Sequence, residues 1–155
     1  IKSESEWDEY LGTIASETGL TLSLTEDDGS ILRTEGHRPS LGAHIRETKE
    51  TLTFVCSQTA RAVRAQVRAT KNPVLEQCDA GLLYLAVPIL RGEKVVGLVT
   101  ACGKAPDDEA PEAFLIAKQL KISEERAEEL IARTPAVDED IVETLGQRIF
   151  TELNG

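Results

Sequence analysis

The sequence runs LLYLAVPILRGEKVVGLVTAC from Leu82 to Cys102. Residues 82–90 and 94–102 are strand-like runs rich in Leu, Val and Ile, and Arg91-Gly92-Glu93 forms a tight connection between them. We therefore expect two neighbouring strands here. Pro88 is expected at an edge or a bulge, because proline cannot donate to a sheet ladder.

The flanking segments extend this pair into a sheet. Residues 74–78 resemble a third strand, and residues 20–26 alternate Leu with Thr and Ser, which is the period of a half-buried strand. Asp27-Asp28-Gly29 has turn chemistry and leads into residues 30–35, so the two runs predict a hairpin.

Helical periodicity occupies the remainder. The helices are expected at residues 4–18, 43–49, 51–70, 112–120, 123–132 and 137–153. Strands and helices are grouped rather than alternating, which predicts an α+β fold with a five-stranded antiparallel sheet, flanking helices and a helical C-terminal extension. Helices on one face would leave the other for a ligand or a cover.

Length and charge restrict the class of protein. A chain of 155 residues with 41% apolar residues predicts one globular domain: an N-terminal helix (1–18), a sheet and helix core (19–104) and C-terminal helices (105–155). The net charge of −10 argues against nucleic acid or an anionic membrane as partner. Three cysteines are too few for a disulfide scaffold, so we expect a reducing cytoplasmic setting.

Signatures of enzymes are missing from the sequence. It contains no phosphate-binding glycine loop, no HExxH and no GxSxG, and its two histidines, His37 and His44, fall in an irregular region. We therefore expect no catalytic activity. The chain starts at Ile1 without Met, and we interpret it as a domain cut from a longer polypeptide with an output domain beyond Gly155.

A motif around Cys78 resembles a known family. Cys78-Asp79-Ala80-Gly81-Leu82 and Ala86-Val87-Pro88-Ile89 precede Gly92 and Val95-Val96-Gly97. This pattern is similar to that of the sensory domain named after PocR, the propanediol-utilisation regulator, and the likeness continues through most of the chain. The resemblance implies a PAS/GAF-like sensor module that binds a small organic ligand and is joined to a signalling output.

The chain also departs from that family pattern. Gly42-Ala43-His44-Ile45 stands where the family has a further cysteine, Tyr84 replaces an acidic residue, and Cys102 is an additional thiol. The identity of the ligand is therefore not carried over by the resemblance.

The expected pocket lies between the helix at 51–70 and the strands at 78–86 and 96–102, whose apolar stripes can face one another. Its predicted ligand-binding residues are Cys56, Cys78, Leu82, Tyr84, Ala86, Leu98 and Cys102. Arg61, Arg64 and Arg68 form a basic face on the helix, which is either solvated, paired with carboxylates, or an anion site.

Two alternatives remain open. Cys56, Cys78 and Cys102, with His44 as a fourth ligand, could bind zinc or an iron–sulfur cluster, or the thiols could act as a redox pair, although no C-x₂-C pair is present. Otherwise each cysteine is a small buried hydrophobe, and the main interpretation needs no cofactor. A dimerisation scaffold that has lost its ligand is the third possibility.

The terminal helices predict a homodimer. Each carries an apolar stripe, and we expect that the sheet cannot bury both, so that two copies would pair through them. The stripes consist of Trp7, Tyr10, Leu11 and Ile14 in one helix and of Ile141, Val142, Leu145, Ile149 and Leu153 in the other.

Overall fold

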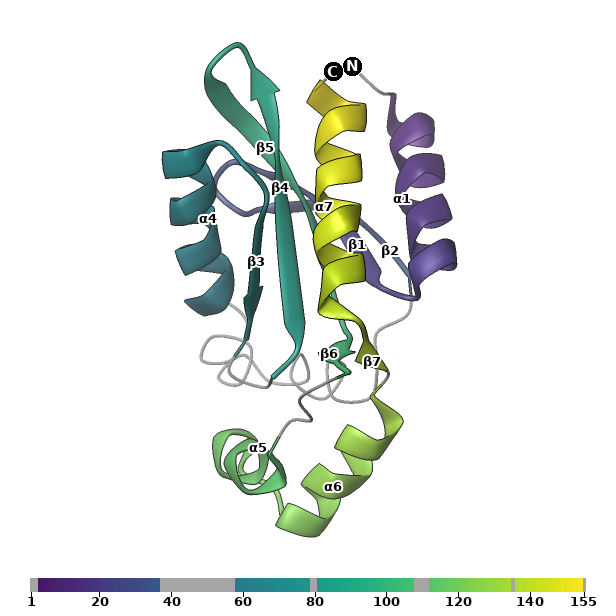
Figure 1. Ribbon diagram of the computed structural model, residues 1–155, viewed down its shortest axis with the longest axis vertical. Coiled ribbons are helices and arrows are strands. Elements are labelled where there is room, and N and C mark those ends of the chain that lie inside the picture. Colours follow the sequence, from purple (N-terminus) through teal and green to yellow (C-terminus); the bar gives the residue numbers. More distant parts are fainter. Residues whose placement is uncertain (1–2, 37–57, 79–80, 108–111, 135, 155) are drawn as a thin grey trace.

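The computed structural model describes residues 3–36, 58–78, 81–107, 112–134 and 136–154 (Figure 1). The expected short helix at 43–49 and the first part of the helix at 51–70 lie outside these residues. In chain order the elements are α1 (Glu4–Thr18), β1 (Thr21–Glu26), β2 (Ile31–Glu35), α4 (Gln58–Thr70), β3 (Val74–Gln77), β4 (Leu83–Arg91), β5 (Lys94–Cys102), β6 (Ala105–Pro106), α5 (Ala113–Leu120), α6 (Glu124–Arg133), β7 (Ala136–Val137) and α7 (Glu139–Asn154).

The central sheet confirms the predicted α+β fold. Its five strands are antiparallel in the order β2-β1-β5-β4-β3. β5 lies in the middle and pairs along its length with both β4 and β1, so the hairpin predicted from the sequence at 82–102 forms the centre of the sheet. The parallel pair β6–β7, with two residues in each strand, was not predicted.

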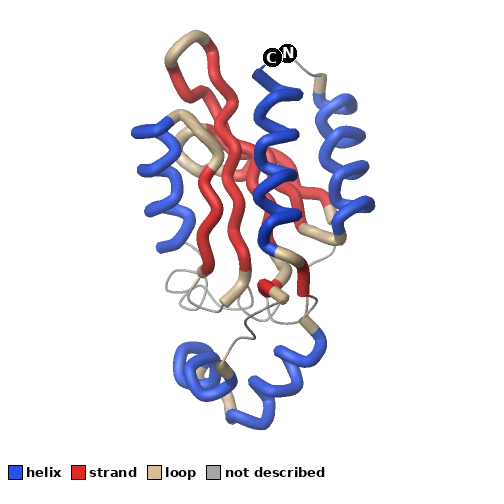
Figure 2. Tube along the Cα trace, in the orientation of Figure 1, coloured by secondary structure: helices blue, strands red, loops and turns tan. Residues whose placement is uncertain are grey.

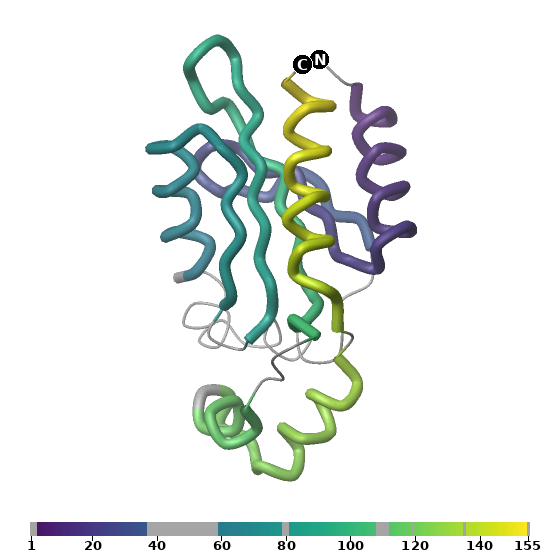
Figure 3. The backbone as a smooth tube through the Cα atoms, in the orientation of Figure 1, coloured from purple at the N-terminus to yellow at the C-terminus, as the bar shows by residue number. Residues whose placement is uncertain are grey.

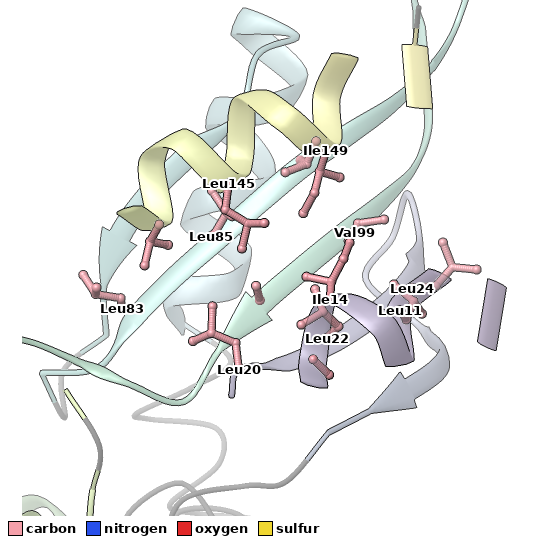
Figure 4. Packing of buried hydrophobic residues seen from close by; sticks show 14 residues of the cluster. Leu11, Ile14, Leu20, Leu22, Leu24, Leu83, Leu85, Val99, Leu145 and Ile149 are labelled. Atoms are coloured by element: carbon pink, nitrogen blue, oxygen red, sulfur yellow. The ribbon is translucent and has the colours of Figure 1, made fainter. Parts of the chain in front are cut away.

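Helices cover both faces of the sheet. On one face α1 and α7 pack against side chains such as Leu22, Leu85 and Val99, which form the main core (Figure 4). On the other face Val63 and Val67 of α4 pack against Ala86 and Leu98. Because side chains alternate along a strand, the sheet presents a different set of residues to each layer.

Both terminal helices fold onto their own sheet, so the expectation that the sheet cannot bury both stripes is wrong for most of their residues. Leu11 and Ile14 of α1 belong to the same buried cluster as Val142, Leu145 and Ile149 of α7, whereas Ile141 stays 59% exposed. The helices run antiparallel side by side over the sheet (Figure 1). The argument for a dimer from unburied stripes is thereby reduced to Ile141 and the half-buried stripe residues, and the dimer stays a prediction.

Polar contacts join the two helices at their exposed sides. The Tyr10 hydroxyl donates to the Glu152 carboxylate at 2.8 Å, and the Arg148 guanidinium lies 3.3 Å from the Glu17 carboxylate. Burial, together with the neighbouring negative charge of Glu152, raises the pKa of Tyr10 well above its ordinary value, so the hydroxyl keeps its proton.

Local signals explain the ends of the helices. Ser3 caps α1 in a capping box with Glu6, and Gly19 ends the helix in the left-handed conformation at φ +73°. Ser123 accepts a hydrogen bond from the Arg126 N–H and caps α6, as the sequence predicted.

The helical hairpin α5–α6 forms a second cluster beyond one end of the sheet (Figure 2). Its buried residues are Leu82, Ala105, Ile116, Leu120, Ala127 and Leu130, and Cys78 packs against them. Cys78 and Leu82 therefore help to support this hairpin.

The close approach of α7 to β4 yields a stability prediction. A Cβ added at Gly146 would lie 2.8 Å from Leu85 Cδ1, whereas one added at Gly12 in α1 would meet no heavy atom closer than Glu35 Oε2 at 4.0 Å. We expect Gly146→Val to lower the free energy of unfolding by about 1–3 kcal/mol through overpacking. Gly12→Val, the matched control, should change it by less than about 0.5 kcal/mol. Urea denaturation measures both, and equal midpoints for the two variants would contradict this account of the α7–β4 contact.

Candidate functional site

The face of β1 that points toward α4 is polar and buried. Thr21, Ser23 and Thr25 are 3%, 8% and 6% exposed, so the predicted half-buried strand is wrong: β1 is buried on both faces. In the sheet Ser23 pairs with Thr100, and Thr25 pairs with Leu98. Paired residues point to the same face, so hydroxyl groups gather under the α4 layer.

A cavity of about 400 Å³ lies over these hydroxyl groups. Its floor consists of residues from β1, β4 and β5, its wall is the β1–β2 turn, and its roof is the first half of α4. The lining residues are Ser23, Thr25, Asp28, Gly29, Ser30, Ile31, Ala60, Arg61, Arg64, Tyr84, Leu98, Thr100 and Cys102. Cavities of this size accommodate small organic molecules.

Thr25 presents an unsatisfied hydroxyl at this cavity. Its Oγ1 is buried and has no hydrogen-bond partner among the residues that the structure describes. The neighbouring Ser23 hydroxyl, in contrast, lies 3.2 Å from the Thr34 hydroxyl. A buried hydroxyl without a partner costs about 1–3 kcal/mol, so a strand that retains one at a cavity is suited to a bound polar group.

The β1–β2 turn and α4 are held together at the cavity wall. Gly29 has φ +93°, and a Cβ there would lie 2.7 Å from the Cζ atom of Arg64, so the bare glycine lets the guanidinium rest against the turn. Arg68 Nη2 donates to the Asp27 carbonyl oxygen at 2.6 Å. These contacts fix the arginine face of α4 beside the turn.

Asp28 contributes negative charge to the same wall. Its carboxylate accepts a hydrogen bond from the Ser30 N–H at 2.8 Å. That hydrogen bond, aided by the positive charge of Arg64, holds the pKa of Asp28 below its ordinary value. Asp28 is therefore ionised at neutral pH.

The predicted site residues divide into four groups. Tyr84, Leu98 and Cys102 line the cavity. Ala86 is fully buried beneath Val63 and Val67 of α4.

Cys78 and Leu82 are not among the lining residues and pack instead in the α5–α6 cluster. Cys56 and His44 lie outside the described residues.

Sequence reasoning missed the polar half of the cavity. The alternation in β1 predicted Ser23 and Thr25 on the solvent side of a half-buried strand, and the arginine face of α4 was left open as solvated, paired with carboxylates or an anion site, without a place in the pocket. A usable signal was present, because three hydroxyl residues alternate through β1 while arginines recur at steps of three and four residues on α4.

The described residues contain no group of three or more His, Cys, Asp or Glu side chains that could hold a metal ion. Cys78 and Cys102 are both half-buried. The predicted four-ligand set includes two residues outside the described part, so a metal or redox role for the cysteines stays a prediction.

Within the described ranges, no helix is long and apolar enough to cross a membrane.

Comparison with known proteins gives a family and two similar folds. No curated protein sequence matches the chain. The GAF domain/HD domain protein from Geobacter sulfurreducens is 15% identical with a TM-score of 0.42, covering 85% of this chain and 94% of that one. A double mutant of the PobR transcription factor inducer-binding domain from Acinetobacter, in complex with 3-hydroxybenzoic acid, is 12% identical with a TM-score of 0.41, covering 84% and 98%.

The family match carries the assignment. The model of the sensory domain found in PocR matches residues 3–153, which includes the described helices, apart from the last residue of α7, and all five strands of the central sheet. The resemblance recognised around Cys78 is thereby confirmed. The chain belongs to the PocR sensory domain family.

Proposed function

We propose that this sensory domain binds a small organic molecule in the cavity between α4 and the sheet. The observation that carries the proposal is the buried hydroxyl of Thr25, a lining residue of the cavity, because this hydroxyl lacks a partner among the described residues. Polar groups inside proteins are nearly always hydrogen-bonded, so a ligand atom is the natural partner for this one. The domain acts by binding, without converting the ligand.

The cavity adjoins the sheet residues that contact the end of α7. Leu98 lines the cavity and pairs with Pro88 of β4. β3 pairs with β4 only as far as Ala86, so Pro88 lies on a free edge, in keeping with the position expected for proline. There the Asn154 side chain donates to the Pro88 carbonyl oxygen at 2.9 Å and accepts from the Leu90 N–H at 2.8 Å.

This arrangement supports a relay through α7. A ligand that displaces Leu98 would move β5 against β4, and the two Asn154 hydrogen bonds would transmit the movement to the exit helix. The first turn of α1 and the last turn of α7 lie at the same end of the domain (Figure 3). An attached output domain or a second copy of the chain would contact both terminal helices there. We propose both as partners, and a cytoplasmic setting for the domain.

Filling the cavity tests where the ligand binds. Ala60 lines the cavity from α4, and Ala65 is exposed on the same helix outside it. We expect Ala60→Trp to abolish ligand-induced thermal stabilisation by occupying the space, while Ala65→Trp leaves it intact. The measurement is a thermal-shift screen of three- to eight-carbon alcohols, amides, ketones and carboxylates. Absence of any stabilising compound, or equal stabilisation of both variants, would refute the proposed site.

Thr25→Val tests the observation that carries the proposal. The substitution removes an unpaired buried hydroxyl, so we expect the free energy of unfolding without ligand to rise by about 1 kcal/mol while ligand affinity falls. Ser23→Ala, which breaks the hydrogen bond to Thr34, should instead lower the free energy of unfolding by about 0.5–1.5 kcal/mol. Urea denaturation and titration with a stabilising compound measure these effects. If Thr25→Val lowers the free energy of unfolding as much as Ser23→Ala does, the Thr25 hydroxyl already has a partner in the free protein, and the proposal loses its supporting observation.

Asn154→Ala tests the relay. Loss of its two hydrogen bonds should leave ligand affinity within about twofold but remove the ligand-induced change in amide hydrogen exchange along α7, because β4 no longer holds the helix end. Thr151→Ala, an exposed substitution on the same helix, is the control and should keep that change. An unaltered exchange response in Asn154→Ala would refute the coupling path.

A further inference from the structure

The cavity carries positive charge in an otherwise acidic protein. Its charged lining residues are two arginines, Arg61 and Arg64, against the single carboxylate of Asp28, although the chain as a whole has a net charge of −10. A local excess of positive charge in a concave site attracts anions and repels cations.

The two arginines that line the cavity differ from the third one on the same helix face. Arg68 is engaged by the Asp27 carbonyl oxygen at 2.6 Å. Arg61 and Arg64 form no ion pair with any residue in the described part of the chain. Arg64 is half-buried, so its guanidinium has lost part of its hydration without a full counter-ion in return.

The position of Arg64 is built into the fold. Val63 and Val67 are fully buried against the sheet and anchor α4, which sets the direction of the residue between them. The guanidinium then rests on Gly29, where a side chain would collide with it. The absence of a side chain at Gly29 therefore leaves room for the Arg64 guanidinium at this wall of the cavity, and the packing of α4 holds the guanidinium there.

Opposite the arginines lies a floor of hydroxyl groups. Thr25 and Thr100 are each 6% exposed, and the Thr25 hydroxyl has its proton available for an acceptor, since no described residue bonds to its Oγ1. A carboxylate is an acceptor at both oxygens, and it matches the planar donor face of a guanidinium. Leu98 contributes apolar surface to the same cavity, against which a carbon chain can lie.

We infer that the ligand is a small organic monocarboxylate, held by Arg61 and Arg64 with the Thr25 hydroxyl as an additional donor. This inference rests on the proposed function and names its ligand class. A single negative charge balances the excess of the two guanidinium groups over Asp28. The carbon body lies toward Leu98, Tyr84 and Cys102 at the other lining strands.

Matched pairs of compounds test the inference on the intact domain. Butyrate is compared with butanamide, lactate with propane-1,2-diol and benzoate with benzyl alcohol, and inorganic phosphate serves as an anion without a carbon body. Affinities are measured by calorimetry and by following the arginine Nε–Hε resonances. We expect at least one carboxylate to bind at least tenfold more tightly than its neutral counterpart and than phosphate, and its affinity to fall as salt is raised.

Arginine variants identify the groups responsible. Arg64→Gln and Arg61→Gln retain good helix formers at positions on the helix surface, and each should weaken carboxylate binding on the order of tenfold, with little effect on a neutral compound. Arg126→Gln removes the same charge from α6, outside the cavity, and is the control, expected to leave binding unchanged. Circular dichroism confirms that each variant is folded.

The outcomes separate the two proposals. Equal or tighter binding of the neutral counterparts or of phosphate, or arginine variants that bind carboxylates like the control, overturns the carboxylate assignment. Neutral binding that Ala60→Trp abolishes leaves the proposed function standing. Failure of both compound classes to bind overturns the carboxylate assignment together with the proposed cavity.

Discussion

The structure depends on one constraint: β5 lies at the centre of a sheet whose two faces are both covered. Along the covered part of β5, from Gly97 to Cys102, each side chain must be accommodated by one layer or the other. Val99 and Ala101 enter the apolar core beneath α1 and α7, whereas Leu98, Thr100 and Cys102 face α4. On the first face, aliphatic residues pack closely and leave the side chains buried. The second combines aliphatic and hydroxyl side chains and is left with a cavity, so the same strand both organises the core and contributes to the candidate site.

The two layers differ in what they contribute to stability. Aliphatic burial under α1 and α7 supplies the favourable free energy of folding without polar groups to satisfy. Under α4, Val63 and Val67 anchor the helix over Ala86, and the hydroxyl residues beside them bury polar atoms at a cost. The buried Thr25 hydroxyl, which has no partner among the described residues, lowers the stability of the fold. Such destabilising groups are typical of binding sites, where the residues that best bind a ligand differ from those that best stabilise the protein without it.

Much of the fold was predictable because local pattern and tertiary role agree. The central hairpin, the turn at Asp28 and Gly29, the ends of α1 and α6 and the five antiparallel strands all follow from periodicity and capping chemistry. The layer that covers each strand face could not be read from the sequence. A Thr or Ser that alternates with Leu has the same pattern whether water or a helix lies over it, and only the position of α4 decides between them. For the same reason Arg61 and Arg64 resembled an ordinary solvated face, and the apolar stripes of α1 and α7 resembled surfaces in need of a partner.

The location of the cavity explains how binding and signalling could share one element. In the proposed mode of binding, a ligand between α4 and the sheet would contact β5 on one face, while α7 packs on the opposite face against β4 and β3. Gly146 brings α7 so close to Leu85 that the helix has little freedom to slide over the sheet without displacing side chains. At the other end Asn154 bonds to the backbone of β4 beyond the last residue that β3 covers. In the proposed relay, a displacement of β5 by the ligand would be resisted where α7 is tightly packed and transmitted where α7 is held by two hydrogen bonds. Packed interfaces of this kind shift between discrete arrangements, so a small movement at Leu98 can select between positions of the exit helix.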